Sequence, residues 1–92
     1  MMGHRWATER LWLGLAIPSD EAWTQGSTHF VERPACAEAL PEGPSHPDVF
    51  NELAKQLQTQ AGEAAKATVL EKRAQAYGQM LSTCGNCHTS GC

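Results

Sequence analysis

The stretch Tyr77-Gly78-Gln79-Met80-Leu81-Ser82-Thr83-Cys84-Gly85-Asn86-Cys87-His88 decides the fold that we expect for this chain. It completes a stripe of residues whose spacing alternates between four and three, as on one face of an amphipathic α-helix. The members of this stripe are Leu70, Ala74, Tyr77, Leu81, Cys84 and His88. Thr68 and Glu71 have the spacing of a capping box, and Gly91 follows as a stop signal. The pattern predicts a last helix over residues 68–88 that turns this stripe toward the core.

Residues 84–88 of that helix have the C-x-x-C-H spacing that is typical of covalent haem attachment. Two thiols add to the haem vinyl groups, and the histidine beside the second thiol turns its imidazole toward the iron. On a helix, Cys84, Cys87 and His88 project from one face toward a single flat ligand. We therefore predict one haem c, with Cys84 and Cys87 as its thioethers and His88 as the proximal iron ligand.

Two other chemistries use the same side chains. A structural zinc module would take Cys84, Cys87, His88 and Cys92 as ligands, but zinc ligand pairs usually lie about a dozen or more residues apart. A thioredoxin-like redox motif belongs at the start of a helix that follows a strand, and no strand-rich segment precedes Cys84. The zinc module stays open as an alternative, and it predicts a metal without porphyrin.

The rest of the chain predicts three further helices, because it has few β-branched residues and no sustained period-two alternation. We expect these helices over residues 2–17, 20–31 and 46–61. Pro18 ends the first helix, and Ser19 or Asp20 caps the second. A proline-rich crossover loop over residues 32–44 then joins two antiparallel helical hairpins. The sequence thus predicts one all-α domain over residues 1–92, an antiparallel four-helix bundle.

Several side chains of these helices are candidates for the core. In the second helix the inward face carries Trp23, Gly26 or Ser27, and Phe30. In the third it carries Val49 or Phe50, Leu53, Leu57, and Gln60 or Ala61. We expect Trp6, Trp12 and Trp23 to form core or haem-pocket walls, because a tryptophan exposes a large apolar area on a surface. We expect His29 and His46 to face solvent.

Composition limits the classes of function. The chain has 92 residues, 41% of them hydrophobic, so it builds only a thin core that a covalently held haem would fill. Its net charge is −3 and it has no basic run, which gives nucleic-acid binding no electrostatic basis. The acidic balance suits docking to a basic redox partner protein, and we expect no catalysis on a substrate.

Haem attachment to C-x-x-C-H normally occurs outside the cytoplasm, so we expect a periplasmic or otherwise extracytoplasmic protein. The apolar stretch 11–17 is too short to span a membrane, and it lacks the small-residue cleavage site of a secretory signal. We assign this stretch to the folded domain. We expect that a leader was removed upstream.

Four helices in two hairpins, with C-x-x-C-H near the C-terminus, resemble the cytochrome c-prime superfamily, especially its small monohaem, methionine-ligated relatives. Residues 77–88 look like the last helix of such proteins, and Met2-Gly3-His4-Arg5-Trp6 is similar to the start of their first helix. The resemblance implies an electron-transfer protein, working alone or docked in a respiratory or photosynthetic complex. It also implies that Met2 is the distal iron ligand.

The distal side of the iron separates two functions, because a sixth protein ligand makes an electron carrier whereas an open position admits small gases. Beside Met2, Met1 and His4 are alternative ligands, since Met1, His4, Thr8, Leu11 and Leu15 form a cleaner stripe than the face carrying Met2. These methionines also suit a frayed terminus or simple core packing. With no distal ligand, the protein would be a gas-binding protein of the cytochrome c-prime type, open to nitric oxide or carbon monoxide.

Further residues complete the predicted haem surroundings. Tyr77, Met80, Leu81 and Trp6 are candidates for the haem pocket, with Met80 packing by the porphyrin edge. Arg5, Arg10 and Arg73 are either solvated or paired with haem propionates. Cys36 and Cys92 are able to form a disulfide in an oxidising compartment, but free or intermolecular thiols fit the sequence equally.

Overall fold

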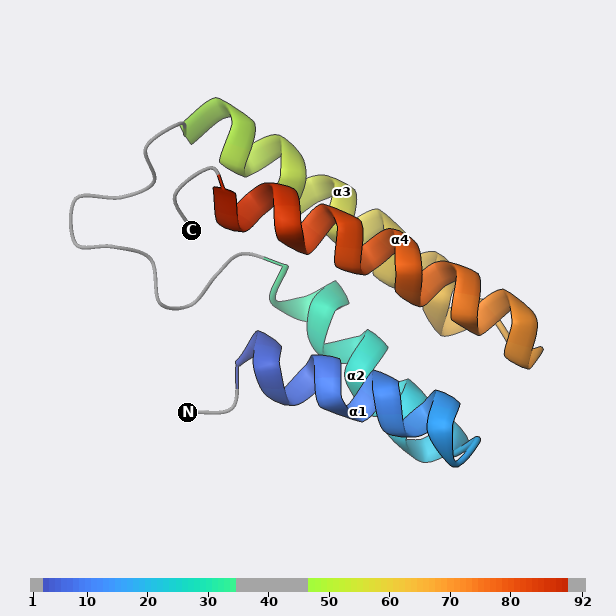
Figure 1. Ribbon diagram of the computed structural model, residues 1–92. Helices are drawn as coiled ribbons and strands as arrows, with labels where there is room; N and C mark the ends of the chain where they lie inside the picture. The colour runs from blue at the N-terminus through green and yellow to red at the C-terminus, as the bar shows by residue number, and fades with distance from the viewer. Residues whose placement is uncertain (1–2, 35–46, 90–92) are drawn as a thin grey trace.

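The computed structural model describes residues 3–34 and 47–89, which contain four helices and no strand. α1 (His4–Ala16) and α2 (Asp20–Glu32) form one antiparallel hairpin, and α3 (Pro47–Lys66) and α4 (Leu70–Thr89) form the second (Figure 1). The prediction of an all-α fold with four packed helices is confirmed. Met1, Met2, Cys36, His46 and Cys92 lie outside the described residues.

The turn between α1 and α2 follows the predicted signals. α1 ends at Ala16, just before Pro18, and α2 begins at Asp20. The Ser19 hydroxyl oxygen accepts a 3.2 Å hydrogen bond from the Ala22 amide, which satisfies one of the unpaired donors at the start of α2. Asp20 and Glu21 lie in the first turn, where the helix dipole favours negative charge.

The second hairpin differs from the prediction in where its helices meet. α3 continues to Lys66 instead of ending near Ala61, because the sequence after Ala61 is rich in alanine and other good helix formers. The predicted link over residues 62–67 is therefore wrong, and Ala67 to Val69 connect the helices. α4 begins at Leu70, where the Val69 carbonyl accepts a hydrogen bond from the Arg73 amide at 3.0 Å.

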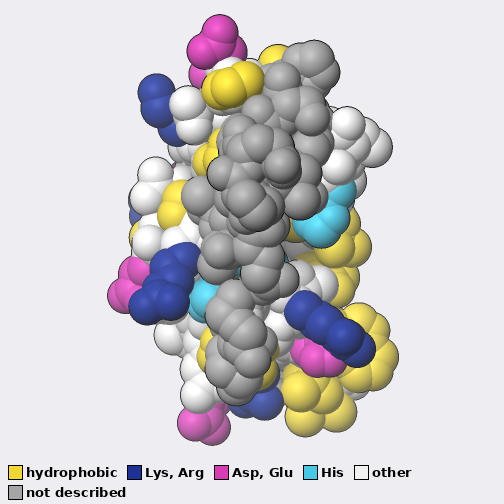
Figure 2. All heavy atoms as spheres, turned by 90° about the vertical axis from the view of Figure 1, so that its left-hand side faces the viewer, with side chains coloured by type: hydrophobic (Ala, Val, Ile, Leu, Met, Phe, Trp, Pro, Cys, Tyr) yellow, Lys and Arg dark blue, Asp and Glu magenta, His cyan; other side chains and the backbone are white. Residues whose placement is uncertain are grey.

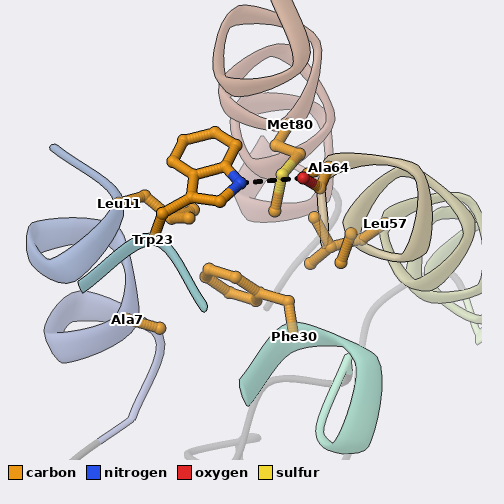
Figure 3. Packing of buried hydrophobic residues seen from close by; sticks show 8 residues of the cluster. Ala7, Leu11, Trp23, Phe30, Leu57, Ala64 and Met80 are labelled. Atoms are coloured by element: carbon orange, nitrogen blue, oxygen red, sulfur yellow. Dashed lines mark hydrogen bonds between the residues drawn. The ribbon is translucent and has the colours of Figure 1, made fainter. Parts of the chain in front are cut away.

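The buried core draws on all four helices (Figure 3). Its members are Ala7 and Leu11 of α1, Trp23 and Phe30 of α2, Leu57, Ala61 and Ala64 of α3, and Met80 of α4. The Trp23 ring nitrogen donates a 2.8 Å hydrogen bond to the Ala64 carbonyl, so the largest buried side chain also has its polar atom satisfied. This bond ties α2 to α3, and with it the two hairpins to each other.

α1 and α2 approach closely at Gly26. A Cβ atom placed there would lie 2.7 Å from the Ala7 carbonyl oxygen and 2.8 Å from Leu11 Cγ. Only a glycine at this position leaves room for so close an approach of α1. The predicted inward faces of α2 and α3 are confirmed, with Phe50 buried and Val49 exposed.

The inward stripe predicted for the last helix is wrong at four of its six residues, whereas Tyr77 and Cys84 pack half-buried against the core. Leu70 and Leu81 are 50% and 43% exposed, and Ala74 and His88 also face solvent. Met80 and Thr83 are buried instead, and Thr83 donates a hydrogen bond to the Gln60 side-chain oxygen of α3 at 2.8 Å. Apolar side chains occur on two adjacent rows of this helix, so spacing alone did not tell which row meets α3.

Three other expectations need correction. Trp12 is 57% exposed, because it lies on the side of α1 opposite the buried Ala7 and Leu11 row. His29 is half-buried, not solvent-facing, because it packs among aromatic rings of α1 and α2. Arg73 pairs with Asp20 at 2.7 Å and lies over the Trp23 ring, at the end of the bundle where α1 meets α2.

Candidate functional site

The last two turns of α4 bring the predicted attachment residues to one pocket. Cys84, Cys87 and His88 line it together, and its empty space amounts to about 260 Å³. The remaining lining residues are His4, Pro34, Leu53, Ala54, Leu57 and Thr83. The pocket lies at the end of the bundle where α1 begins and α4 ends, and Figure 2 shows histidine side chains on this face.

The two thiols differ from an ordinary surface cysteine in their burial. Cys84 is half-buried and packs against the hydrophobic core, and Cys87 is half-buried one turn later. Burial, followed by the neighbouring Cys87, raises the pKa of the Cys84 thiol. At neutral pH this thiol is therefore protonated. Burial also raises the pKa of Tyr77, with a smaller contribution from Cys84.

His88, the predicted proximal ligand, is exposed at the rim of the pocket. It lies in the last turn of α4, where the negative end of the helix dipole favours a histidine. The imidazole and the two thiols thus share one pocket although they differ in exposure. Their roles in haem attachment and iron ligation stay predictions.

The pocket is also lined by a second imidazole, that of His4 at the start of α1. Its Nε2 lies 2.9 Å from the Arg33 carbonyl oxygen, which can only accept, so Nε2 carries the proton. The ring packs edge-on against Phe30, with centroids 4.8 Å apart, and against His29 at 5.8 Å. These contacts fix the His4 ring between the ends of α1 and α2.

His29 belongs to the same aromatic group without lining the pocket. Its ring contacts Trp6 and Phe30 at centroid distances of 6.0 Å and 5.6 Å. Burial, with repulsion from His4 and Arg33, lowers the pKa of His29. The His29 imidazole is therefore neutral near neutral pH.

The other predicted pocket residues do not line this pocket. Met80 is buried in the core, Tyr77 and Trp6 pack half-buried against that core, and Leu81 is exposed. Met1 and Met2 lie outside the described residues, as do Cys36 and Cys92, so the methionine ligand and the disulfide stay predictions. Arg10 donates to Gln25 at 2.9 Å, and Arg5 is exposed.

Sequence reasoning missed the wall that α3 supplies. Leu53, Ala54 and Leu57 face the motif, and of these Leu53 and Leu57 carried a signal, since both lie on the predicted inward stripe of the third helix. These residues come near the motif because the start of α3 lies beside the end of α4 in the antiparallel hairpin, and that register is a property of the fold. Pro34 gave no signal as a pocket residue.

The zinc alternative requires several ligand side chains that converge on one metal ion. Within residues 3–34 and 47–89, no three histidine, cysteine, aspartate or glutamate side chains converge to hold a metal ion. Three of the four predicted zinc ligands belong to these residues, and Cys92 lies outside them. None of the described helices is long and apolar enough to cross a membrane, as the sequence predicted.

Comparison with known proteins gives no relative. No protein-family model, no curated protein and no solved structure matches this chain.

Proposed function

We propose that this chain is a monohaem c-type cytochrome that transfers electrons, with one haem c joined to Cys84 and Cys87. One observation carries the proposal: the three C-x-x-C-H side chains line a single pocket that also has apolar lining residues and a second imidazole, that of His4. Two thiols and one imidazole are the donors that covalent attachment and proximal ligation of a haem c require, and a sixth ligand is a methionine or a second histidine.

The donor set and the packing both suit haem. Leu53, Ala54 and Leu57 offer apolar surface to a flat macrocycle. The 260 Å³ includes open solvent, and the space that these side chains enclose is only about 10 Å³, far below the roughly 300–1,000 Å³ of pockets that enclose small molecules, so haem needs additional room. α1 packs closely on α2 but only sparsely on α4, and this contact is the weakest among the packed helix pairs. Separation of α1 from α4 at the pocket end is therefore the least costly way to make that room.

Each motif side chain has a distinct task. Cys84 and Cys87 would each hold the haem through a thioether. Addition of each S–H bond across a vinyl double bond would give the sulfur one carbon and the adjacent carbon the hydrogen, with no net oxidation. His88, exposed at the rim, is able to turn toward the iron without leaving a core position. Bound haem would supply reversible one-electron exchange.

The net charge of −3 supports docking to a basic redox partner protein, which would be a component of a respiratory or photosynthetic electron-transfer chain. The proposal places the protein outside the cytoplasm, since covalent attachment to C-x-x-C-H normally occurs there. It assigns no catalytic residue. The likeness of residues 77–88 to the last helix of the cytochrome c-prime superfamily supports the same reading.

The proposal is tested by producing the chain in a periplasm that contains a haem-attachment system. We expect haem that stays with the polypeptide after acid denaturation, visible as a mass increase of one haem and a haem c absorption spectrum. Cys84→Ser combined with Cys87→Ser removes it, whereas Cys36→Ser, outside the motif, keeps it. A parent protein that carries no covalent haem, and that unfolds when zinc is chelated, contradicts the proposal.

A further inference from the structure

We propose that His4 is the second axial ligand of the iron, so that the haem is held by two histidines from two different helices. The inference rests on the proposed haem attachment and deepens it. Methionine ligation through Met2 followed from the resemblance alone, whereas the contacts of the described residues favour the imidazole of His4.

The first argument is the chemistry of the pocket. Its described lining residues outside the motif are His4, Pro34, Thr83 and three apolar residues of α3. Among these, His4 alone carries a nitrogen or sulfur donor that iron prefers. Met80, the methionine that the structure describes, is 2% exposed in the core and does not line the pocket.

The second argument is the state of the His4 ring. Because Nε2 donates to the Arg33 carbonyl, the neutral ring keeps its lone pair on Nδ1. A histidine that binds a metal commonly donates its other ring N–H to a backbone carbonyl, which fixes the tautomer and the ring orientation. The 2.9 Å contact with Arg33 and the packing on Phe30 thus give His4 the support that iron ligands require.

The third argument is the placement of the two helices. His88 lies on α4 and His4 on α1, and both lie at the same end of the bundle (Figure 1). These two helices contact each other sparsely, whereas each packs closely on its hairpin partner. Two imidazoles on loosely packed, separate helices are able to approach a ring from opposite faces. Two ligands on one turn of a single helix would reach only one face of the ring.

The test uses the protein with its covalent haem and reads the iron ligands by spectroscopy. We expect the oxidised parent protein to be low-spin, with an electron paramagnetic resonance spectrum of two imidazole ligands and no methionine-to-iron band in the near infrared. His4→Ala produces a high-spin haem that binds carbon monoxide without ligand displacement. Met2→Leu, the variant that tests the rival methionine assignment, is expected to keep the spectrum of two imidazole ligands.

His4→Met guards against a variant that fails to fold, because a thioether there is able to ligate the iron. We expect it to show the methionine-to-iron band and a higher reduction potential than the parent protein. The inference is overturned if the parent shows a methionine band that Met2→Leu abolishes, or if the parent is already high-spin, as a gas-binding protein would be. Covalent haem, measured by mass in every sample, is independent of these spectra, so loss of the axial assignment is distinguishable from failure of haem attachment.

Discussion

Gly26 offers the sharpest test of how α1 and α2 are packed. An alanine at this position would place its Cβ 2.7 Å from the Ala7 carbonyl oxygen and 2.8 Å from Leu11 Cγ, closer than real Cβ contacts. The nearest atom belongs to the backbone, so a rotamer change cannot relieve the overlap. Overpacking of this kind costs about 1–3 kcal/mol, and the higher helix propensity of alanine returns about 0.8–1.0 kcal/mol.

Subtracting the propensity gain from the overpacking cost leaves an expected loss of roughly 1–2 kcal/mol in the free energy of unfolding. For a domain of this size it corresponds to a loss of about 4–16 °C in Tm. Gly78→Ala is the matched control, because Gly78 is also a helical glycine but a Cβ there would meet nothing within 4 Å. That variant gains up to about 1 kcal/mol from propensity alone.

Urea unfolding of the parent protein and both variants, in the same haem state, measures the two free energies. The reasoning is refuted if Gly26→Ala is as stable as Gly78→Ala, because the α1–α2 contact would then have room for a methyl group. The contact also bears on the site. Ala7 lies one turn after His4, so a displacement of α1 at Gly26 is expected to reach the His4 ring as well.

Three further perturbations have expected outcomes. Trp23→Phe removes the hydrogen bond to the buried Ala64 carbonyl and should lower the free energy of unfolding by about 1–3 kcal/mol in urea titrations; a loss below 0.5 kcal/mol would contradict the buried bond. Asp20→Asn should lower it by less than about 1 kcal/mol, because Asp20 is 86% exposed where it pairs with Arg73; a loss above 2 kcal/mol would show that the ion pair is not screened by solvent. In the haem-free protein the raised pKa of the Cys84 thiol should shift the pH midpoint of its alkylation above the midpoint in the urea-unfolded chain. The free energy of unfolding should also fall as the pH rises above the unfolded thiol's pKa of about 8.5, because folding disfavours the thiolate. Peptide-resolved mass spectrometry measures the two alkylation midpoints, and equal midpoints would refute the burial of Cys84.

The sequence predicted helix ends well where a single residue imposes the geometry. Pro18 cannot continue a helix and Ser19 supplies a capping oxygen, so the first turn lies where it was expected. The boundary between α3 and α4 carries only weaker signals, Gly62 and the Thr68–Glu71 capping box, and α4 begins at Leu70 instead of Thr68. Alanine, glutamate and lysine after Ala61 are all compatible with a helix, and packing against the neighbouring helices decided where α3 ends.

The orientation of α4 was unpredictable for a related reason. Leu81 and Met80 are adjacent in sequence, and either fits an inward row of three- and four-residue spacings. The choice depends on which row meets α3, and the Thr83 hydroxyl bonded to Gln60 belongs to the row that is buried. Cys84 and Cys87 were predicted as one site because their spacing is local. His4 stayed one of several alternatives, because its distance from residues 84–88 in sequence hides its position in space.

The two ends of the bundle are built differently, and this difference bears on how the proposed haem would enter. Where α1 meets α2 and α3 meets α4, Trp23 is bonded to Ala64, and Arg73 pairs with Asp20 while lying 5.4 Å from the centre of the Trp23 ring. The other end holds His4 and the C-x-x-C-H residues, and α1 and α4 share few contacts along their length. This end is also fastened, because Gln58 Nε2 of α3 donates a 2.8 Å hydrogen bond to the Val31 carbonyl of α2. Entry of a flat apolar ligand between α1 and α4 would therefore leave the Trp23 end intact but would have to keep or break the Gln58–Val31 bond.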